Sequence, residues 1–399
     1  MISQVLVVSL LAGAGLAVPL NDDSAAQSAI VTGGKVTASI PTTLTEGVEW
    51  LVPIQVANKT FNVQLDTGSA DLWLFCTEGP QNVESGHNQY DPKSGTKLNG
   101  ASFDINYGSG FAKGDVYTDK VTLGGITVTQ AVECATSVDD TDDNDHKLDG
   151  ILGVGFNSGG GVFGILQTDQ PDPQMTLVEN AFPQLVSGLF TADLNFNQNG
   201  VYNFGYIDQA RFTTPITYMP VRNFNNWIVE TSGYQIGNNG AQSVTWKALI
   251  DTGTTNVLLP PSVVDAYFAA APQAKKQSEG VYYVPCDATT AALPNFTITF
   301  TPPQPVASFI QPSSSGGINT RPYNAVIPGK YFIGNPTGKN DGMCQGGMNN
   351  MGAEQPWDII LGDVFLMTQL VVFDVADPNG SVDSSYPSHG QIGFAPKPA

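Results

Sequence analysis

The chain has 399 residues, of which 41% are hydrophobic and 13% charged, and it contains 43 glycines and 27 prolines. This length suits two domains or lobes, and the many turn-forming residues favour short strands over long, salt-bridged helices. Asp and Glu number 36 against 16 Lys and Arg, and the formal net charge of −20 argues against binding to nucleic acid or to an anionic membrane surface.

The N-terminal residues 1–17 are interpreted as a secretory signal peptide rather than a short anchor helix. Residues 5–18 form an apolar run too short to span a bilayer, and Gly15 and Ala17 are small residues suited to cleavage after Ala17. We therefore expect secretion to the extracellular space, with delivery to a vacuole as the alternative. Residues 18–34 are small and polar without periodicity, which predicts a short pro-segment or flexible tail.

Secretion permits disulfides and glycosylation. Each half of the chain has two cysteines, and spacing alone does not choose among the three pairings, although one bridge inside each half is the simplest. The cysteines are Cys76, Cys134, Cys286 and Cys344. Three sequons predict N-glycosylation at Asn58, Asn295 and Asn379. His and Cys are not clustered at metal-ligand spacing, so we expect no metal site.

From residue 35 onward, short alternating apolar runs predict β-strands. Residues 50–56 and 61–65 are expected to form a hairpin that places Asp66 at a strand end. Residues 102–122 predict a second hairpin, whose tip consists of Tyr107, Gly108, Ser109 and Gly110. The predicted N-terminal β lobe therefore spans residues 35–207 and carries this hairpin.

The predicted C-terminal β lobe spans residues 208–399. After Pro260 and Pro261, Ser262 is expected to cap a short helix. Residues 301–343 are rich in Pro, Ser, Gly and Asn, which predicts one or more long surface loops.

One motif occurs in both halves. Asp66-Thr67-Gly68-Ser69 lies between apolar runs, and it recurs as Asp251-Thr252-Gly253-Thr254 between similar runs. Each copy is followed much later by Ile-Leu-Gly, at 151–153 and at 360–362. A single Asp-Thr-Gly is a common turn, but matching flanks on both copies indicate two similar halves.

Two such motifs supply two carboxylates, and these can share a proton only if the two carboxyl groups are in contact. Two touching carboxyl groups do not both ionise easily, so they hold one proton across a wide acidic range. The ionised group can then draw a proton from water while the protonated group donates to a peptide carbonyl. Gly68 and Gly253 leave room beside the carboxylates, Ser69 and Thr254 are placed to bond their outer oxygens, and Thr67 and Thr252 are placed to tie the loops together.

The chain resembles the pepsin family of aspartic peptidases, particularly its secreted fungal branch of penicillopepsin-like or polyporopepsin-like enzymes. The resemblance covers roughly residues 35–396. It depends on the segments Asp66-Thr67-Gly68-Ser69-Ala70-Asp71-Leu72-Trp73, Tyr107-Gly108-Ser109-Gly110, Asp149-Gly150-Ile151-Leu152-Gly153, Asp251-Thr252-Gly253-Thr254-Thr255 and Ile360-Leu361-Gly362-Asp363-Val364-Phe365.

The resemblance implies an all-β, bilobal acid protease fold, with two pseudo-two-fold related lobes, a few short helices and a cleft between the lobes. It implies that Asp66 and Asp251 are catalytic, and that Tyr107 lies on a flap over the substrate with Gly108 and Ser109, oriented by the indole N–H of Trp73. It also implies a Cys286–Cys344 disulfide, which leaves Cys76–Cys134 as the second pair. We expect polypeptide substrates, no cofactor, no membrane anchor and a monomer.

The sequence departs from the family in the prosegment and in the substrate-binding wall. Residues 18–34 contain no Lys or Arg, whereas the prosegment of the family is usually basic and longer. The acidic run 139–145 replaces apolar residues of the substrate-binding wall, which predicts tolerance of basic or polar substrate residues there.

Two alternative functions compete with a peptidase. One is a pepsin-like binding module without activity, although such relatives typically lose a catalytic Asp or distort the flap. The other is a serine hydrolase, for which the chain has no Gly-x-Ser-x-Gly motif and only three histidines, all in polar stretches.

Overall fold

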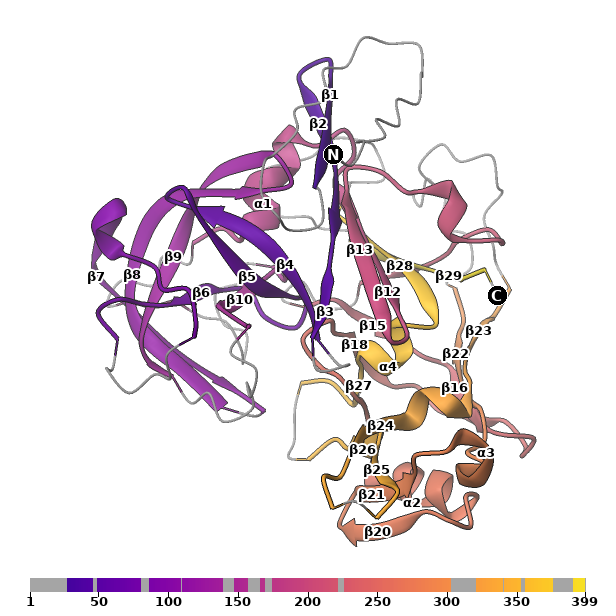
Figure 1. Ribbon diagram of the computed structural model, residues 1–399. Helices are drawn as coiled ribbons and strands as arrows, with labels where there is room; N and C mark the ends of the chain where they lie inside the picture. The colour runs from indigo at the N-terminus through magenta and orange to yellow at the C-terminus, as the bar shows by residue number, and fades with distance from the viewer. Residues whose placement is uncertain are drawn as a thin grey trace, which may run out of the picture.

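The structure is a computed structural model dominated by β-strands (Figure 1). It describes residues 27–45, 49–79, 86–108, 110–138, 147–156, 166–168, 174–221, 226–302, 321–339, 341–352, 356–375 and 390–398. The strands form five sheets and the helices are short, which confirms the predicted all-β, bilobal class. The predicted signal peptide, the acidic run 139–145, Ser109 and Asn379 lie outside the described residues. Among the residues described, no helix is long and apolar enough to cross a membrane.

The N-terminal lobe is built on one nine-stranded sheet. In spatial order its strands are β11 (Leu166–Thr168), β7 (Thr96–Tyr107), β8 (Gly110–Leu123), β9 (Ile126–Val138), β6 (Leu72–Phe75), β10 (Gly150–Gly153), β5 (Lys59–Asp66), β4 (Glu49–Val56) and β3 (Thr43–Thr45). Strands β4 and β5 form the first predicted hairpin, and β7 and β8 form the second, with Tyr107 opposite Gly110. Both hairpin predictions are confirmed. The short helices of this half are η1 (Pro92–Ser94), α1 (Leu177–Ala181) and η2 (Phe182–Gln184).

A seven-stranded antiparallel sheet contains strands from both halves of the chain. Its order is β1 (Ser28–Thr32), β2 (Lys35–Pro41), β13 (Gln198–Phe204), β12 (Leu189–Asn195), β28 (Gln369–Asp374), β29 (Gln391–Pro396) and β14 (Thr217–Pro220). The halves meet where β12 pairs with β28, and Figure 1 shows this sheet between the two lobes. Residues 28–32, assigned from the sequence to the pro-segment or tail, form the edge strand β1. Its side chains are mostly exposed, which explains the missing apolar period.

The C-terminal lobe contains three smaller sheets. In spatial order, the first has β15 (Ile228–Glu230), β18 (Lys247–Ile250), β27 (Ile359–Leu361), β19 (Val257–Leu259) and β26 (Met348–Asn350). The second has β17 (Gln242–Ser243), β16 (Gly233–Ile236), β22 (Phe296–Phe300) and β23 (Tyr323–Ile327). The third has β20 (Lys275–Ser278), β21 (Val281–Pro285), β25 (Met343–Gly346) and β24 (Ile333–Pro336). The short helices of this half are η3 (Gln209–Arg211), α2 (Pro261–Ala269), α3 (Ala288–Ala291), η4 (Gly329–Phe332) and α4 (Asp363–Leu366).

Two local predictions in this lobe are wrong. The predicted loop region 301–343 contains β23, η4 and β24, because β22 and β25 supply the distant backbone partners that a local sequence pattern does not reveal. The helix α2 begins at Pro261 after the N-cap Pro260, without a side-chain cap from Ser262. Proline suits this first position because its φ is already helical and it has no N–H to satisfy.

The predicted sequence repeat is also a repeat of strand topology. In the N-terminal lobe, β5 runs parallel to β10, and β10 runs antiparallel to β6. In the C-terminal lobe, β18 runs parallel to β27, and β27 runs antiparallel to β19. Each Ile-Leu-Gly strand therefore lies between the two apolar runs that flank an Asp-Thr-Gly turn. The two turns occupy equivalent positions in their lobes.

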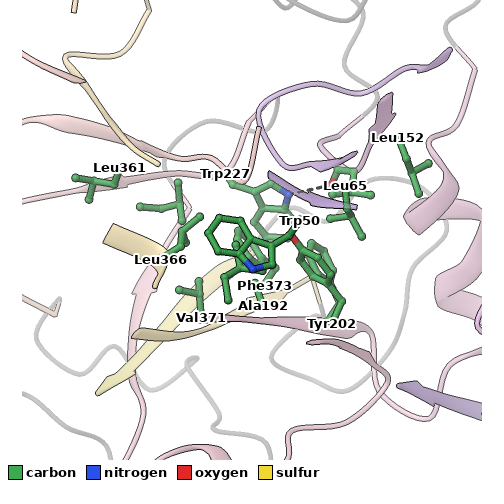
Figure 2. Packing of buried hydrophobic residues seen from close by; sticks show 14 of the residues in the cluster. Trp50, Leu65, Leu152, Ala192, Tyr202, Trp227, Leu361, Leu366, Val371 and Phe373 are labelled. Atoms are coloured by element: carbon green, nitrogen blue, oxygen red, sulfur yellow. Dashed lines mark hydrogen bonds between the residues drawn. The ribbon is translucent and has the colours of Figure 1, made fainter. Parts of the chain in front are cut away.

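An aromatic cluster packs where the two lobes meet (Figure 2). Trp227 of the second half is fully buried, and its Nε1–H donates to the carbonyl oxygen of Val154 in the first half at 3.0 Å. The Trp227 ring centroid lies 4.4 Å from that of Phe156 and 5.1 Å from that of Phe373. Buried aromatic rings contribute large apolar areas, so this cluster stabilises the contact between the lobes.

Substitution of Gly150, the first residue of β10, tests how closely β10 packs against β6. Gly150 has a φ of +152°, and a Cβ there would overlap the carbonyl oxygen of Trp73 and lie 2.9 Å from the Cα of Leu74. We expect Gly150→Ala to lower the free energy of unfolding by about 3 kcal/mol or more, because strain and overlap add. Gly240→Ala is the matched control, since no atom lies within 4 Å of its Cβ position. Equal urea unfolding midpoints for the two variants would contradict this account.

Candidate active site

The two predicted aspartates lie at equivalent strand ends. Asp66 is the last residue of β5, and Asp251 directly follows β18. The Asp66 carbonyl oxygen accepts a hydrogen bond from the Val154 N–H at 2.8 Å, and the Asp251 N–H donates to the Leu361 carbonyl at 3.2 Å. Val154, which directly follows the first Ile-Leu-Gly segment, and Leu361 of the second segment therefore hold the two backbones. The two side chains are 5% and 6% exposed, so their carboxyl groups are largely shielded from bulk water.

The two carboxyl groups face each other across the lobes. Gly68 lies so close to the opposite aspartate that a Cβ there would be 2.6 Å from Asp251 Oδ1, and a Cβ on Gly253 would overlap Asp66 Oδ1. The same glycines donate backbone hydrogen bonds, from Gly68 to Asp66 Oδ1 at 2.7 Å and from Gly253 to Asp251 Oδ1 at 2.8 Å. Each glycine therefore leaves room for the opposite carboxyl group and orients its own.

Hydroxyl groups bind the other carboxyl oxygens. The Ser69 Oγ–H donates to Asp66 Oδ2, and the Thr254 Oγ1–H donates to Asp251 Oδ2 at 2.7 Å. Each aspartate thus receives one backbone and one hydroxyl hydrogen bond in the same arrangement. Such donors fix the orientation of a carboxyl group before any substrate binds.

Two threonines join the two turns beneath the carboxyl groups. The Thr67 N–H donates to Thr252 Oγ1, and the Thr252 N–H donates to Thr67 Oγ1, both at 3.0 Å. The Thr67 hydroxyl donates to the Ile250 carbonyl at 2.8 Å, and the Thr252 hydroxyl donates to the Leu65 carbonyl at 2.5 Å. Both threonines are buried, so these bonds between lobes are shielded from water.

The electrostatics of the pair favour a shared proton. Burial, followed by the charge of Asp251, raises the pKa of Asp66 well above its usual range. Two anions in contact in a buried site repel strongly, whereas one proton between them removes the repulsion and forms a hydrogen bond. The arrangement therefore supplies one proton donor and one proton acceptor side by side.

The predicted flap tyrosine lies on the hairpin formed by β7 and β8. The Trp73 Nε1–H donates to the Tyr107 hydroxyl oxygen at 2.9 Å, as the family resemblance implies. Gly108 follows at the exposed tip, where no atom lies within 4 Å of a Cβ position. Trp73 belongs to β6, which begins shortly after the Asp66 turn. The indole therefore links the flap to the strand that follows one carboxyl group.

The remaining predicted sites lie away from the carboxyl pair. The structure contains both disulfides, Cys76–Cys134 and Cys286–Cys344. Asn58 lies in the exposed turn between β4 and β5, and Asn295 is exposed just before β22. Glycosylation at these two asparagines stays a prediction.

Sequence reasoning missed three buried carboxyl groups near the site. Asp71, Glu133 and Asp363 are 6%, 1% and 1% exposed. Asp71 lies in the segment that contains Asp66, and Asp363 lies in the segment that contains the second Ile-Leu-Gly. Glu133 is an acidic residue within an apolar stretch of β9, and this contrast is the sequence signal that could have identified it. Burial, followed by the charge of Asp251, raises the pKa of Asp363 well above its usual range.

Comparison with known proteins identifies aspartyl proteases as relatives of this chain. The family model described as eukaryotic aspartyl protease matches residues 50–383. The chain is 38% identical over 337 residues to aspergillopepsin-1 of Aspergillus flavus, covering 83% of this chain and 75% of that protein. It is 36% identical over 379 residues to penicillopepsin-3 of Penicillium janthinellum, covering 93% of this chain and 84% of that protein. Penicillopepsin-1 of Penicillium rubens is 38% identical over 374 residues, with 92% and 84% covered.

Replacing one bridging threonine tests whether the hydrogen bonds between the two turns contribute to stability and to peptide cleavage. Thr252→Val keeps the side-chain shape but removes the hydroxyl that bonds Leu65 and Thr67. We expect the free energy of unfolding to fall by about 2–4 kcal/mol, because buried backbone groups lose their partners. We also expect kcat to fall about tenfold or more, since small displacements of positioned groups are costly.

Thr299→Val is the matched control, because it removes an exposed threonine hydrogen bond, from the Thr299 hydroxyl to Asn324 Oδ1, in the same lobe. Urea unfolding and peptide cleavage are measured on both variants. The account is wrong if Thr252→Val matches Thr299→Val in both measurements.

Proposed function

Because the chain belongs to the eukaryotic aspartyl protease family and is an aspartic endopeptidase, we propose that Asp66 and Asp251 activate a water molecule for peptide hydrolysis at acid pH. The observation that carries this proposal is the matched pair of facing carboxyl groups, each held by one glycine N–H and one hydroxyl. Hydrolysis by a water molecule requires no covalent intermediate between the protein and the peptide.

The proposed mechanism assigns the proton to Asp66, because burial and the Asp251 charge raise its pKa. Asp251 as the anion accepts a proton from water while the water oxygen attacks the peptide carbonyl carbon. Asp66 donates its proton to the carbonyl oxygen, which forms a neutral tetrahedral intermediate. Asp251 then donates its proton to the peptide nitrogen, a hydroxyl of the intermediate returns a proton to Asp66, and the C–N bond breaks to release the amine and the carboxylic acid. The pair thus recovers its single proton on Asp66.

The surrounding residues are proposed to hold this geometry. Thr67 and Thr252 keep the lobes in register, so the two carboxyl groups remain in contact. Tyr107, with Gly108 and Ser109 at the tip, is proposed to cover a polypeptide substrate bound between the lobes, while Trp73 orients the tyrosine. Covering the substrate excludes water and strengthens the hydrogen bonds around the reacting atoms.

We also infer that the mature protein is secreted and acts as a monomer. The apolar N-terminal run, the sequons and the disulfides within each lobe support secretion. The lobes are proposed to span residues 35–207 and 208–399, as the position of the repeated motif indicates.

Digestion of a denatured protein at about pH 3–5, with and without a statine-type inhibitor, tests the pair. We expect Asp251→Asn to lower kcat by about 1000-fold or more, because the amide cannot accept the proton from water. Asp265→Asn, which alters a half-exposed carboxylate on α2, is expected to cleave normally. Cleavage that survives in Asp251→Asn would remove this mechanism. An intact protein that cleaves nothing at any acid pH would favour a binding module.

The pH dependence of kcat gives an independent test. The Ser69 hydrogen bond lowers the pKa of Asp66 and so opposes the effect of burial. Ser69→Ala removes that bond, so Asp66 keeps its proton to higher pH. We expect the alkaline fall in kcat to move to higher pH in Ser69→Ala, while the maximal kcat falls. A fall that moves to lower pH would assign the essential proton to another group.

A further inference from the structure

A second pair of buried carboxyl groups lies beside the flap. Asp71 directly precedes β6, and Glu133 lies on β9, where it pairs in register with Trp73. The two carboxyl groups hydrogen-bond to each other. Ionised carboxylates only accept hydrogen bonds, so one of the two must carry a proton. Asp71 Oδ2 and Glu133 Oε2 are buried and receive no hydrogen bond from any other donor among the described residues.

The surroundings of this pair are apolar. Glu133 shares its face of β9 with Ala131 and Ala135, which belong to a buried cluster that also contains Trp73 and Val116. Glu133 is the register partner of Trp73 in the parallel pairing of β6 and β9, so the two side chains lie on the same face of the sheet. Burial is the main reason why the pKa of Asp71 rises to about 6, and burial followed by the charge of Asp71 raises the pKa of Glu133 well above its usual range.

The pair also acts on the flap tyrosine. Burial, followed by the charges of Asp66, Asp71 and Glu133, raises the pKa of the Tyr107 hydroxyl well above its usual range. Tyr107 therefore lies within electrostatic reach of Asp66 and of the second pair. Tyr107 on β7 is titratable and faces the second pair, while β8 presents the apolar Val116 opposite Glu133. The described lysines, arginines and histidines contribute to neither carboxyl shift.

We propose that Asp71 and Glu133 are positioning residues for peptide hydrolysis, because their shared proton holds the Trp73 indole where it orients the flap tyrosine. This inference rests on the proposed function, since flap position matters to activity only if a peptide is cleaved. When the pH rises and the shared proton leaves, two buried anions face each other without a compensating cation. Their repulsion displaces Trp73, Tyr107 loses its N–H donor, and the flap no longer covers the substrate.

The proposal separates two kinetic quantities. Loss of the catalytic proton lowers kcat, whereas loss of flap position weakens substrate binding and raises KM. Asp71 ionises first, at a pKa of about 6, and Glu133 keeps the shared proton because burial and the Asp71 charge raise its pKa well above the usual range. We therefore expect KM of the intact protein to stay constant through pH 6 and to rise at higher pH, where Glu133 loses that proton. Steady-state cleavage of one peptide across this range measures both quantities.

Three variants test the pair. Glu133→Ala leaves Asp71 without its partner, and we expect KM to rise about tenfold at every pH. Glu133→Gln donates a permanent amide hydrogen bond to Asp71, so KM is expected to stay within about twofold of the acid value and to remain low as the pH rises. Asp104→Asn alters an exposed carboxylate on β7 and is the control, with an unchanged KM profile. A KM that rises with pH in Glu133→Gln as in the intact protein would overturn the proposal.

Trp73 emission gives a measurement that does not depend on cleavage. The signal is the difference in fluorescence between each protein and its Trp73→Phe counterpart, which removes the contribution of the other tryptophans. We expect this difference to change above pH 6 in the intact protein, where Glu133 loses the shared proton, and to stay constant in Glu133→Gln. A pH-independent difference in the intact protein would also overturn the proposal. If the intact protein cleaves nothing, the proposed function fails, and the fluorescence alone decides whether the pair holds the indole.

Discussion

The paired hydrogen bonds between Thr67 and Thr252 are the contact on which the site depends. Each aspartate belongs to a different lobe, so their separation is set by the contact between lobes rather than by either fold alone. Proton sharing falls off sharply with distance, because it needs direct contact between carboxyl groups. The repeated strand topology, the Trp227 bond to Val154 and the shared seven-stranded sheet all preserve that contact.

Local sequence signals predicted the site better than they predicted the sheets. Asp66, Asp251 and Tyr107 lie at strand ends beside short turns, and such turns depend on nearby residues. The strands β23 and β24 were missed because their stability comes from partners distant in sequence. Glu133 was missed for a related reason. An acidic residue within an apolar strand gives no sign of which carboxyl group will share its proton until the parallel pairing of β6 and β9 is known.

Acid pH stabilises the folded protein as well as the single-proton state of the proposed catalytic pair. Burial raises the pKa of Asp66, Asp71, Glu133 and Asp363, so the folded chain binds more protons than the unfolded chain over the range between the ordinary carboxyl pKa and the raised values. The stabilising contribution of these protons is complete at low pH and is lost as the pH rises through that range. Protonation also reduces the self-repulsion of a chain with a net charge of −20.

The order of strands in the seven-stranded sheet has a consequence for biosynthesis. The strand β28 pairs with β12 of the first half, and β29 joins β28 to β14, yet both are translated long after Asp251. A nascent chain that has already emerged with both aspartates therefore still lacks the strands that bring the lobes together. The two aspartates are therefore synthesised before the strands that complete the sheet shared by the lobes, so the framework around the carboxyl pair is completed only near the end of translation.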